Sequence, residues 1–204
     1  MITVCPATPF DAKGLLLEAA RAQSPVTFLE RGRLYRSEPP KDSNGNIIAA
    51  MAEYWNVPDG YYTLPLGKAR RLRIGDGPTS IAIICWGTMV LEACTAAADT
   101  VNRVGGAIEV VDLRTLAPFD EEAVVAAVRE ANRVIVVTEE SDLTSFGRHI
   151  HSWIVQNCFY DLDGTPAFIG ALPAPAAPYN GPEEIVFFPT ARTIEEKIEE
   201  LLAE

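Results

Sequence analysis

Basic residues are scarce in this sequence of 204 residues: 17 Lys and Arg stand against 28 Asp and Glu, giving a formal net charge of -11 at pH 7. Proteins that bind nucleic acids or anionic membranes do so through clustered Lys and Arg. The charge balance therefore argues against both partners and favours a partner with a basic surface. Long apolar runs are also missing, since none approaches the roughly 18 residues of a membrane-spanning helix, and we see no signal-peptide pattern at the N-terminus.

The sequence also lacks C-x-x-C pairs, G-x-G-x-x-G and G-K-[ST]. Without these glycines a backbone cannot closely approach a pyrophosphate, so we do not expect a dinucleotide or a nucleoside triphosphate. Three of the four cysteines lie in apolar patterns, where a reduced cysteine acts as a small hydrophobe. We therefore predict a reducing, cytoplasmic location. The four cysteines are Cys5, Cys85, Cys94 and Cys158.

The stretch from residue 79 to residue 140 alternates short Ile- and Val-rich runs with longer amphipathic runs. Unbroken apolar runs are typical of strands buried on both faces, and helices between them form the crossovers of a parallel sheet. We therefore predict an α/β fold, a three-layer sandwich with a mostly parallel sheet. Thr88 and Asp120 are placed to cap the two helices. The later elements that we predict are two helices and a strand, near residues 146–159, 190–203 and 166–170.

The flanking segments differ in character from this core. Residues 2–30 predict strand, helix and strand, with Asp11 placed to cap the helix. Residues 31–77 are rich in Pro, Gly, Asn and charge, which is typical of a linker over a surface, with a short helix in IIAAMAEYW and an edge strand over 68–74. The proline-rich residues 172–184 predict an irregular crossover.

Glu139 and Glu140 follow a predicted strand, at the edge of a parallel sheet where ligands usually bind. Paired acids in such a place can transfer protons. Adjacent residues on a strand face opposite ways, however, so the two cannot both point at one substrate. A solvated or interface-facing pair is the favoured interpretation.

His149 and His151 lie two residues apart on a predicted helix, so they point about 200° apart and cannot ligate one metal together. Helix-surface histidines are the favoured interpretation, and no Ser/His/Asp or Cys/His grouping follows from spacing. The residues by themselves thus predict no catalytic residue, no cofactor-binding residue and no metal site.

The end of the last predicted helix is acidic. Carboxylates there oppose the helix dipole, so helix stability is an incomplete explanation. Solubility is one reading, and a docking surface for a basic partner is the other. The residues are Glu195, Glu196, Glu199, Glu200 and Glu204.

Several motifs together resemble the beta subunit of thiamine diphosphate-dependent 2-oxoacid dehydrogenases, the first component of the pyruvate and branched-chain complexes. They are DAKGLL at 11–16, LPLGKA at 64–69, VVDLRTLAPFD at 110–120, TEES at 138–141 and FGRHI at 146–150. DAKGLL followed by LPLGKA favours this family over transketolase itself. The resemblance covers most of the chain apart from residues 37–59, which are longer than the family pattern.

The resemblance implies a partial pyrimidine-binding α/β unit over residues 1–36, a linker over 37–77 and a transketolase-type C-terminal domain over 78–204. On the family pattern Met1 falls late in the pyrimidine-binding domain. The family glutamate and histidine that serve thiamine diphosphate then lie before this sequence. Most ligands of the cofactor and its Mg would accordingly lie outside this chain.

The resemblance also implies partners: an alpha subunit and beta–beta pairing in a heterotetramer, and the basic subunit-binding domain of the acyltransferase component. Asp163 and Glu204 take the places that hold that domain in some family members. The loop Ala19–Ser24 corresponds to a monovalent-cation loop, with Ala22 in place of the family aspartate.

Two functions remain open at this point. The first is part of an enzyme that decarboxylates a 2-oxoacid oxidatively and transfers the acyl group to lipoyl, this part serving assembly and docking, with the isolated chain inactive. The second is a non-catalytic α/β binding or assembly module.

Overall fold

The computed structural model describes residues 1–203, apart from the side chain of Ile185. Its larger sheet has five strands in the order β3-β5-β4-β7-β8. Four of them run parallel, and β3 is antiparallel to β5. The position of β3 at the edge of the sheet confirms the edge strand predicted over 68–74. The strands are β3 Arg70–Gly75, β4 Thr79–Cys85, β5 Ala107–Asp112, β7 Val134–Ser141 and β8 Ala167–Ala171.

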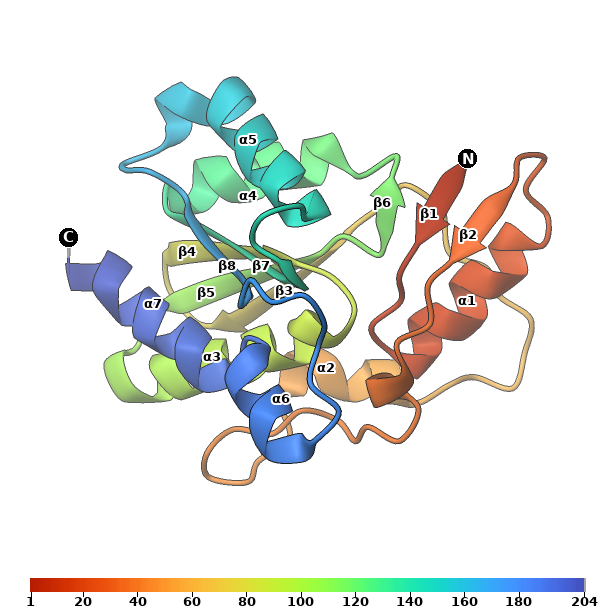
Figure 1. The fold of residues 1–204 in the computed structure, drawn as a ribbon, viewed down its shortest axis with the longest axis horizontal. Coiled ribbons are helices and arrows are strands. Elements are labelled where there is room, and N and C mark those ends of the chain that lie inside the picture. Colours follow the sequence, from red (N-terminus) through yellow and green to blue (C-terminus); the bar gives the residue numbers. More distant parts are fainter. Residues whose placement is uncertain (204) are drawn as a thin grey trace.

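Helices cover both faces of this sheet, which confirms the predicted three-layer α/β sandwich (Figure 1). The helices α3 Thr88–Val104 and α7 Ala191–Ala203 pack on one face, and α4 Glu121–Ala131 and α5 Phe146–Cys158 pack on the other. Successive residues of a strand face opposite sides. Ile83 accordingly joins the cluster under α3 and α7, and its neighbour Ile84 joins the cluster under α4 and α5.

A second sheet of three strands, in the order β2-β1-β6, stands beside the first (Figure 1). Strands β1 Ile2–Val4 and β2 Val26–Phe28 are parallel and are joined by α1 Pro9–Ala19, as predicted. Strand β6 Thr115–Ala117 comes from the later chain and pairs antiparallel with β1. The sequence prediction missed β6, because three residues are too few to show a period. The two sheets are thereby tied together by one continuous segment.

Two predicted helix caps are wrong. The cap of α1 is Thr8, whose Oγ1 accepts the Asp11 N–H at 3.2 Å, so the Asp11 carboxylate is left for other partners. Gly87 takes the cap position of α3 with a φ of 57°, and Thr88 is the first helical residue. The cap of α4 is Asp120, as predicted, and it accepts the Ala123 N–H at 3.2 Å.

Part of the segment predicted to cross the surface is folded into the core. It contains η1 Gly32–Leu34, α2 Ala49–Ala52 and η2 Glu53–Trp55. The side chains of Ile48 and Met51 belong to the main hydrophobic cluster, and Met51 is 0% exposed. Residues 37–59 therefore contribute to packing.

The predicted irregular crossover is also partly helical. The helix α6 Gly181–Phe187 begins within it, after Asn180, whose side chain accepts the Glu183 N–H at 3.0 Å. A short η3 Phe159–Asp161 follows α5. Within residues 1–203, no helix combines the length and the apolar character that crossing a bilayer requires.

Candidate functional site

The junction between the two sheets holds a buried ionic cluster around Asp11, which is 0% exposed. Arg70 binds its carboxylate through both terminal nitrogens, with Nη1 donating to Oδ2 at 2.8 Å. Arg114 Nη1 donates to Oδ1 at 3.3 Å, and Thr8 Oγ1 donates to Oδ2 at 2.8 Å. Paired guanidinium–carboxylate bonds of this kind fix geometry as well as charge. The cluster thereby holds α1 against β3 and the turn between β5 and β6.

The two arginines are themselves anchored. Arg114 lies in the left-handed backbone region with a φ of 54°, and its Nε and Nη2 donate to the Lys68 carbonyl at 3.0 and 2.7 Å. The Arg70 guanidinium lies over the ring of Tyr54, 3.4 Å from the ring centroid. Such a stack is favourable, and most so where water is excluded.

Asp112 completes the cluster at the end of β5. Its Oδ1 accepts the Arg114 N–H at 3.1 Å, while its Oδ2 has no hydrogen-bond partner among the described residues. The pKa of Asp112 is raised to about 7, first by burial and then by the charge of Asp11, while Arg70 and Arg114 oppose the rise.

The sequence reasoning missed Arg70, Asp112 and Arg114, although one signal was present. On a strand, every second side chain faces the same side of the sheet. Arg70 therefore lies on the same buried face as Leu72 and Ile74. Its partner Asp11 lies 59 residues away, which no local pattern reveals.

The two family motifs also touch through a glycine. The Leu64 N–H donates to the Gly14 carbonyl at 3.1 Å. A Cβ on Gly14 would lie 2.6 Å from Leu64 Cγ and 2.8 Å from Tyr62 Cε2, which is closer than real contacts allow. DAKGLL and LPLGKA thus contribute interior contacts between the N-terminal unit and the segment that leads into β3.

The predicted acid pair is divided between two partners. Glu139 lies 3.4 Å from Arg31 Nε, and Glu140 Oε2 accepts the Phe146 N–H at 2.6 Å. Glu140 therefore supports the start of α5, where the helix dipole favours a negative charge. The structure does not bring the two carboxylates together for proton transfer.

The predicted histidines are also separated. His151 Nε2 donates to the Pro166 carbonyl at 2.8 Å, and His149 lies among Phe146 and Phe119. Within residues 1–203 no three His, Cys, Asp or Glu side chains are grouped to hold a metal ion. The four cysteines are free and buried.

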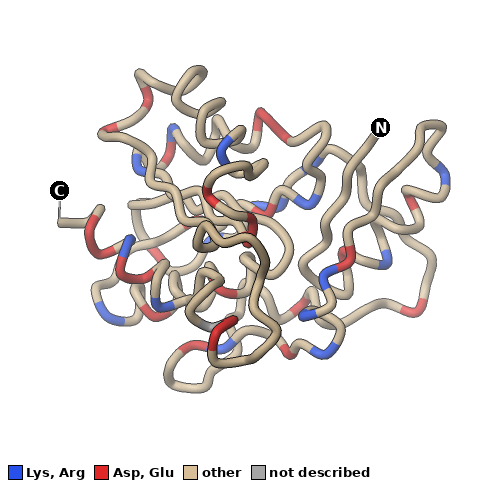
Figure 2. The backbone as a smooth tube through the Cα atoms, in the orientation of Figure 1, with Lys and Arg blue, Asp and Glu red and all other residues tan. Residues whose placement is uncertain are grey.

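The four described acids of α7 form ion pairs with three basic residues, and Figure 2 shows acidic and basic positions interspersed near the C-terminal end of the chain. Arg103 pairs with both Glu195 and Glu199, Arg192 pairs with Glu196, and Lys197 pairs with Glu200. The predicted site residue Glu204 lies outside the described residues.

Asp163 lies on the surface, and its N–H donates to the Asn132 carbonyl at 2.9 Å. It makes no ion pair within residues 1–203. It lines a cavity of about 490 Å³ with Phe159 and Tyr160, which are 63% and 99% exposed. An unpaired acid beside exposed aromatic rings has the composition of an interaction surface.

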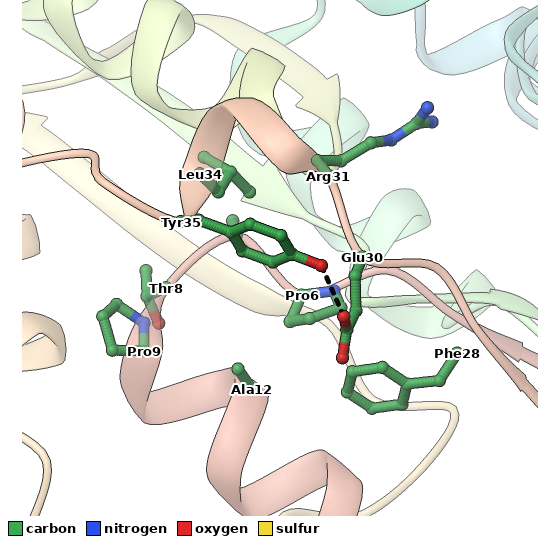
Figure 3. A pocket seen from close by; sticks show the side chains of 10 residues that line it. Pro6, Thr8, Pro9, Ala12, Phe28, Glu30, Arg31, Leu34 and Tyr35 are labelled. Atoms are coloured by element: carbon green, nitrogen blue, oxygen red, sulfur yellow. Dashed lines mark hydrogen bonds between the residues drawn. The ribbon is translucent and has the colours of Figure 1, made fainter.

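A smaller, largely apolar pocket of about 230 Å³ lies beside the start of α1 (Figure 3). Pro6, Pro9 and Phe28 form part of its wall, and the Tyr35 hydroxyl donates to Glu30 Oε2 at 2.6 Å across it. The residues that line this pocket do not indicate a catalytic function.

The loop Ala19–Ser24 begins at the last residue of α1 and continues as a turn beyond the helix. The Arg21 and Ala22 N–H groups donate to the carbonyls of Glu18 and Ala19 at 3.0 and 3.2 Å. Those two carbonyls are therefore engaged in the turn. No carboxylate stands at position 22.

The fold and the interior motifs place this chain in a known class. The family model for the transketolase C-terminal domain matches residues 67–194. The chain therefore belongs to the transketolase C-terminal domain family.

Within that class the chain is similar to beta subunits of 2-oxoacid dehydrogenases, which confirms the resemblance in its motifs. It is 35% identical to the 2-oxoisovalerate dehydrogenase subunit beta of Pseudomonas aeruginosa over 92% of this chain and 51% of that relative. It is 36% identical to the pyruvate dehydrogenase E1 component subunit beta of Bacillus subtilis over 89% of this chain and 50% of that relative. The chain spans about half the length of the curated relatives it matches.

Other similarities are consistent with this assignment. The chain is 34% identical to the beta subunit of an acetoin:2,6-dichlorophenolindophenol oxidoreductase of Cupriavidus necator, over 94% of this chain and 50% of that relative. Its fold is similar to that of a split gene transketolase solved as an inactive beta4 tetramer, with a TM-score of 0.73 and 20% identity over 100% of this chain and 58% of that chain. This last similarity concerns the fold alone.

Proposed function

We propose that this chain is the assembly and docking portion of the beta subunit of a 2-oxoacid dehydrogenase. The whole enzyme would decarboxylate a 2-oxoacid oxidatively and transfer the acyl group to lipoyl. The observation that carries the proposal is the ionic cluster around Asp11. The most specific family motifs meet in the protein interior there, and they hold an N-terminal unit against the transketolase-type domain.

Thiamine diphosphate and Mg do not fit the residues of this chain. The one strongly buried carboxylate pair, Asp11 and Asp112, is enclosed by Arg70 and Arg114, and no metal-ligating group forms within residues 1–203. We infer that the cofactor contacts lie in an alpha subunit and in parts of the beta subunit outside this sequence. The isolated chain is then inactive.

The acyltransferase component supplies the docking partner in this proposal. Asp163 offers an unpaired carboxylate beside exposed Phe159 and Tyr160, and a basic subunit-binding domain complements it. The paired acids of α7 contribute less, because each of them already lies against a basic residue of the chain. Heterotetramer formation with an alpha subunit completes the assembly.

The test of activity uses the purified chain with thiamine diphosphate, Mg²⁺ and either pyruvate or 2-oxoisovalerate, and it follows reduction of 2,6-dichlorophenolindophenol. We expect no turnover. Turnover by the chain alone would overturn the proposal.

A non-catalytic binding or assembly module is the second candidate, and the absence of a metal-ligating group within residues 1–203 is equally consistent with it. Co-purification with an alpha subunit of a 2-oxoacid dehydrogenase separates the two. A stable complex supports the beta-subunit function, and failure to form one supports the module.

A further inference from the structure

The tip of an exposed loop carries the dipeptide Asn44-Gly45. An antiparallel bridge between Lys41 and Ile47 closes this loop. Both residues of the dipeptide are exposed, and a Cβ added to Gly45 would meet no atom within 4 Å. Gly45 has a φ of 84°, which glycine adopts without steric cost. The loop belongs to residues 37–59, the part of the chain that the family resemblance does not cover.

An asparagine that precedes a glycine can react with water without an enzyme. The backbone nitrogen of the glycine attacks the side-chain Cγ of the asparagine, since no neighbouring Cβ shields that nitrogen. A new N–Cγ bond forms and the Cγ–Nδ2 bond breaks, so that the side-chain nitrogen leaves as ammonia with the proton of the attacking nitrogen. Water then opens the cyclic imide. Breaking the new N–Cγ bond gives aspartate, and breaking the original peptide C–N bond gives isoaspartate.

The chain contains a second pair of this kind, Asn180-Gly181, and the structure distinguishes the two pairs. Both are exposed. The Asn180 side chain and carbonyl accept the N–H groups of Glu183 and Glu184, each at 3.0 Å, because Asn180 caps α6. The side-chain amide of Asn44 makes no hydrogen bond within residues 1–203. Asn44 can therefore turn toward the next backbone nitrogen, whereas Asn180 must first leave its cap.

Only the local turn opposes the reaction at Asn44. The Gly45 N–H donates to the Asp42 carbonyl at 2.9 Å, and the Asn44 N–H donates to Asp42 Oδ1 at 3.0 Å. Hydrogen bonds that are open to water are exchanged for bonds to water at a small net cost. Residues 43–46 are all exposed, so opening the turn uncovers no buried side chain.

The tip of the loop is held against α3 beside two carboxylates. Asn102 Nδ2 donates to Asp42 Oδ2 at 3.0 Å. The Ser43 N–H donates to Asp99 Oδ1 at 2.6 Å. A further carboxylate at position 44 would therefore join two existing negative charges, and like charges repel.

We propose that Asn44 is a site of spontaneous deamidation, and that the carboxylate which it gains weakens the hold of the loop on α3. Water is the only co-reactant, and ammonia is the only molecule released. The reaction is faster at higher pH, because the attacking nitrogen must lose its proton. This proposal does not depend on the proposed function.

The test is incubation of the full chain at mildly alkaline and at mildly acidic pH, each with and without denaturing urea. Digestion with pepsin in acid and mass spectrometry then locate the products. We expect aspartate and isoaspartate to accumulate at position 44, faster at the higher pH. In the folded chain Asn180 should react about fivefold more slowly than Asn44, since a helix cap must be broken. In urea the two positions should react alike.

Equal rates at the two positions in the folded chain would overturn the assignment to Asn44. So would an unchanged Asn44 in the folded chain under conditions in which the unfolded chain reacts.

Asn44→Asp reproduces the charge of the product, and Asn44→Gln is the matched control because it keeps an uncharged amide. We expect Asn44→Asp to lower the melting temperature by about 1–3 °C at low salt, and the loss to shrink at high salt. The melting temperature of Asn44→Gln should match that of the chain without the substitution. Equal melting temperatures for the two variants, or a loss that does not depend on salt, would overturn the proposed weakening of the loop.

Discussion

Asp11 joins the two parts of the molecule through a single carboxylate. It receives hydrogen bonds from Arg70, Arg114 and Thr8, which come from three separate segments. Burying such ions costs desolvation, so the pair adds little net stability compared with apolar packing. Removing one member of the cluster is strongly destabilising, because the remaining charges stay buried without compensation.

Asp11→Asn should therefore lower the free energy of unfolding by about 3–5 kcal/mol, since it leaves two buried guanidinium groups facing a neutral amide. Urea denaturation followed by circular dichroism measures the change. Glu196→Gln is the control, because the exposed Arg192–Glu196 pair contributes at most about 1 kcal/mol. Similar losses in the two variants would contradict the interpretation of the cluster.

Asp112 gives the cluster a pH dependence of defined sign. Its pKa is raised from 3.8 to about 7, first by burial and then by Asp11. Because the folded state holds this proton more tightly than the unfolded state, the stabilisation is complete below about pH 4 and is lost as the pH rises through about 7. Asp112→Asn removes this titration and keeps the side-chain shape.

The free energy of unfolding is measured for both proteins between pH 4.5 and pH 8.5. The difference between the two values cancels the titration of all other groups. We expect the free energy of unfolding of the variant to increase, relative to that of the chain without the substitution, as the pH rises. The increase is on the order of a few kcal/mol. A difference that is independent of pH would show that Asp112 does not titrate in this range.

At the scale of elements, the long periodic segments were predictable from the sequence. Strands β4, β5 and β7 and the helices between them follow from apolar runs and amphipathic periods. Elements that depend on distant partners were missed. Strand β6 exists because β1 lies beside it, and Thr8 replaces Asp11 as a cap because the arginines take the Asp11 carboxylate. The candidate site was hidden for the same reason, since its charges meet only in the folded chain.

Met51 tests whether residues 37–59 are part of the fold or a covering loop. Its side chain is fully buried in the main cluster, so Met51→Ala should cost about 2–5 kcal/mol of unfolding free energy. Ile47→Ala, four residues earlier and 50% exposed, should change it by less than about 0.5 kcal/mol. Thermal denaturation of both variants gives the comparison. Equal changes in the free energy of unfolding for the two variants would indicate that the segment is a surface linker.

At the scale of the molecule, the net charge of -11 sets the general attraction for basic partners, and local pairing decides where such a partner binds. The acids of α7 are paired with Arg103, Arg192 and Lys197. Asp163 has no such partner within residues 1–203, and Tyr160 beside it is almost fully exposed. We therefore propose Asp163, in preference to the α7 acids, as the centre of docking.

Asp163→Lys should weaken binding of a basic acyltransferase subunit-binding domain at least about tenfold, because an attractive contact becomes a repulsive one. Isothermal titration calorimetry at two salt concentrations measures this, and the loss should shrink at high salt. Asp59→Lys, at an exposed turn, changes the net charge by the same amount and is expected to bind almost as the unchanged chain does. Equal losses in the two variants would mean that net charge alone attracts the domain, and undiminished binding by Asp163→Lys would place docking elsewhere.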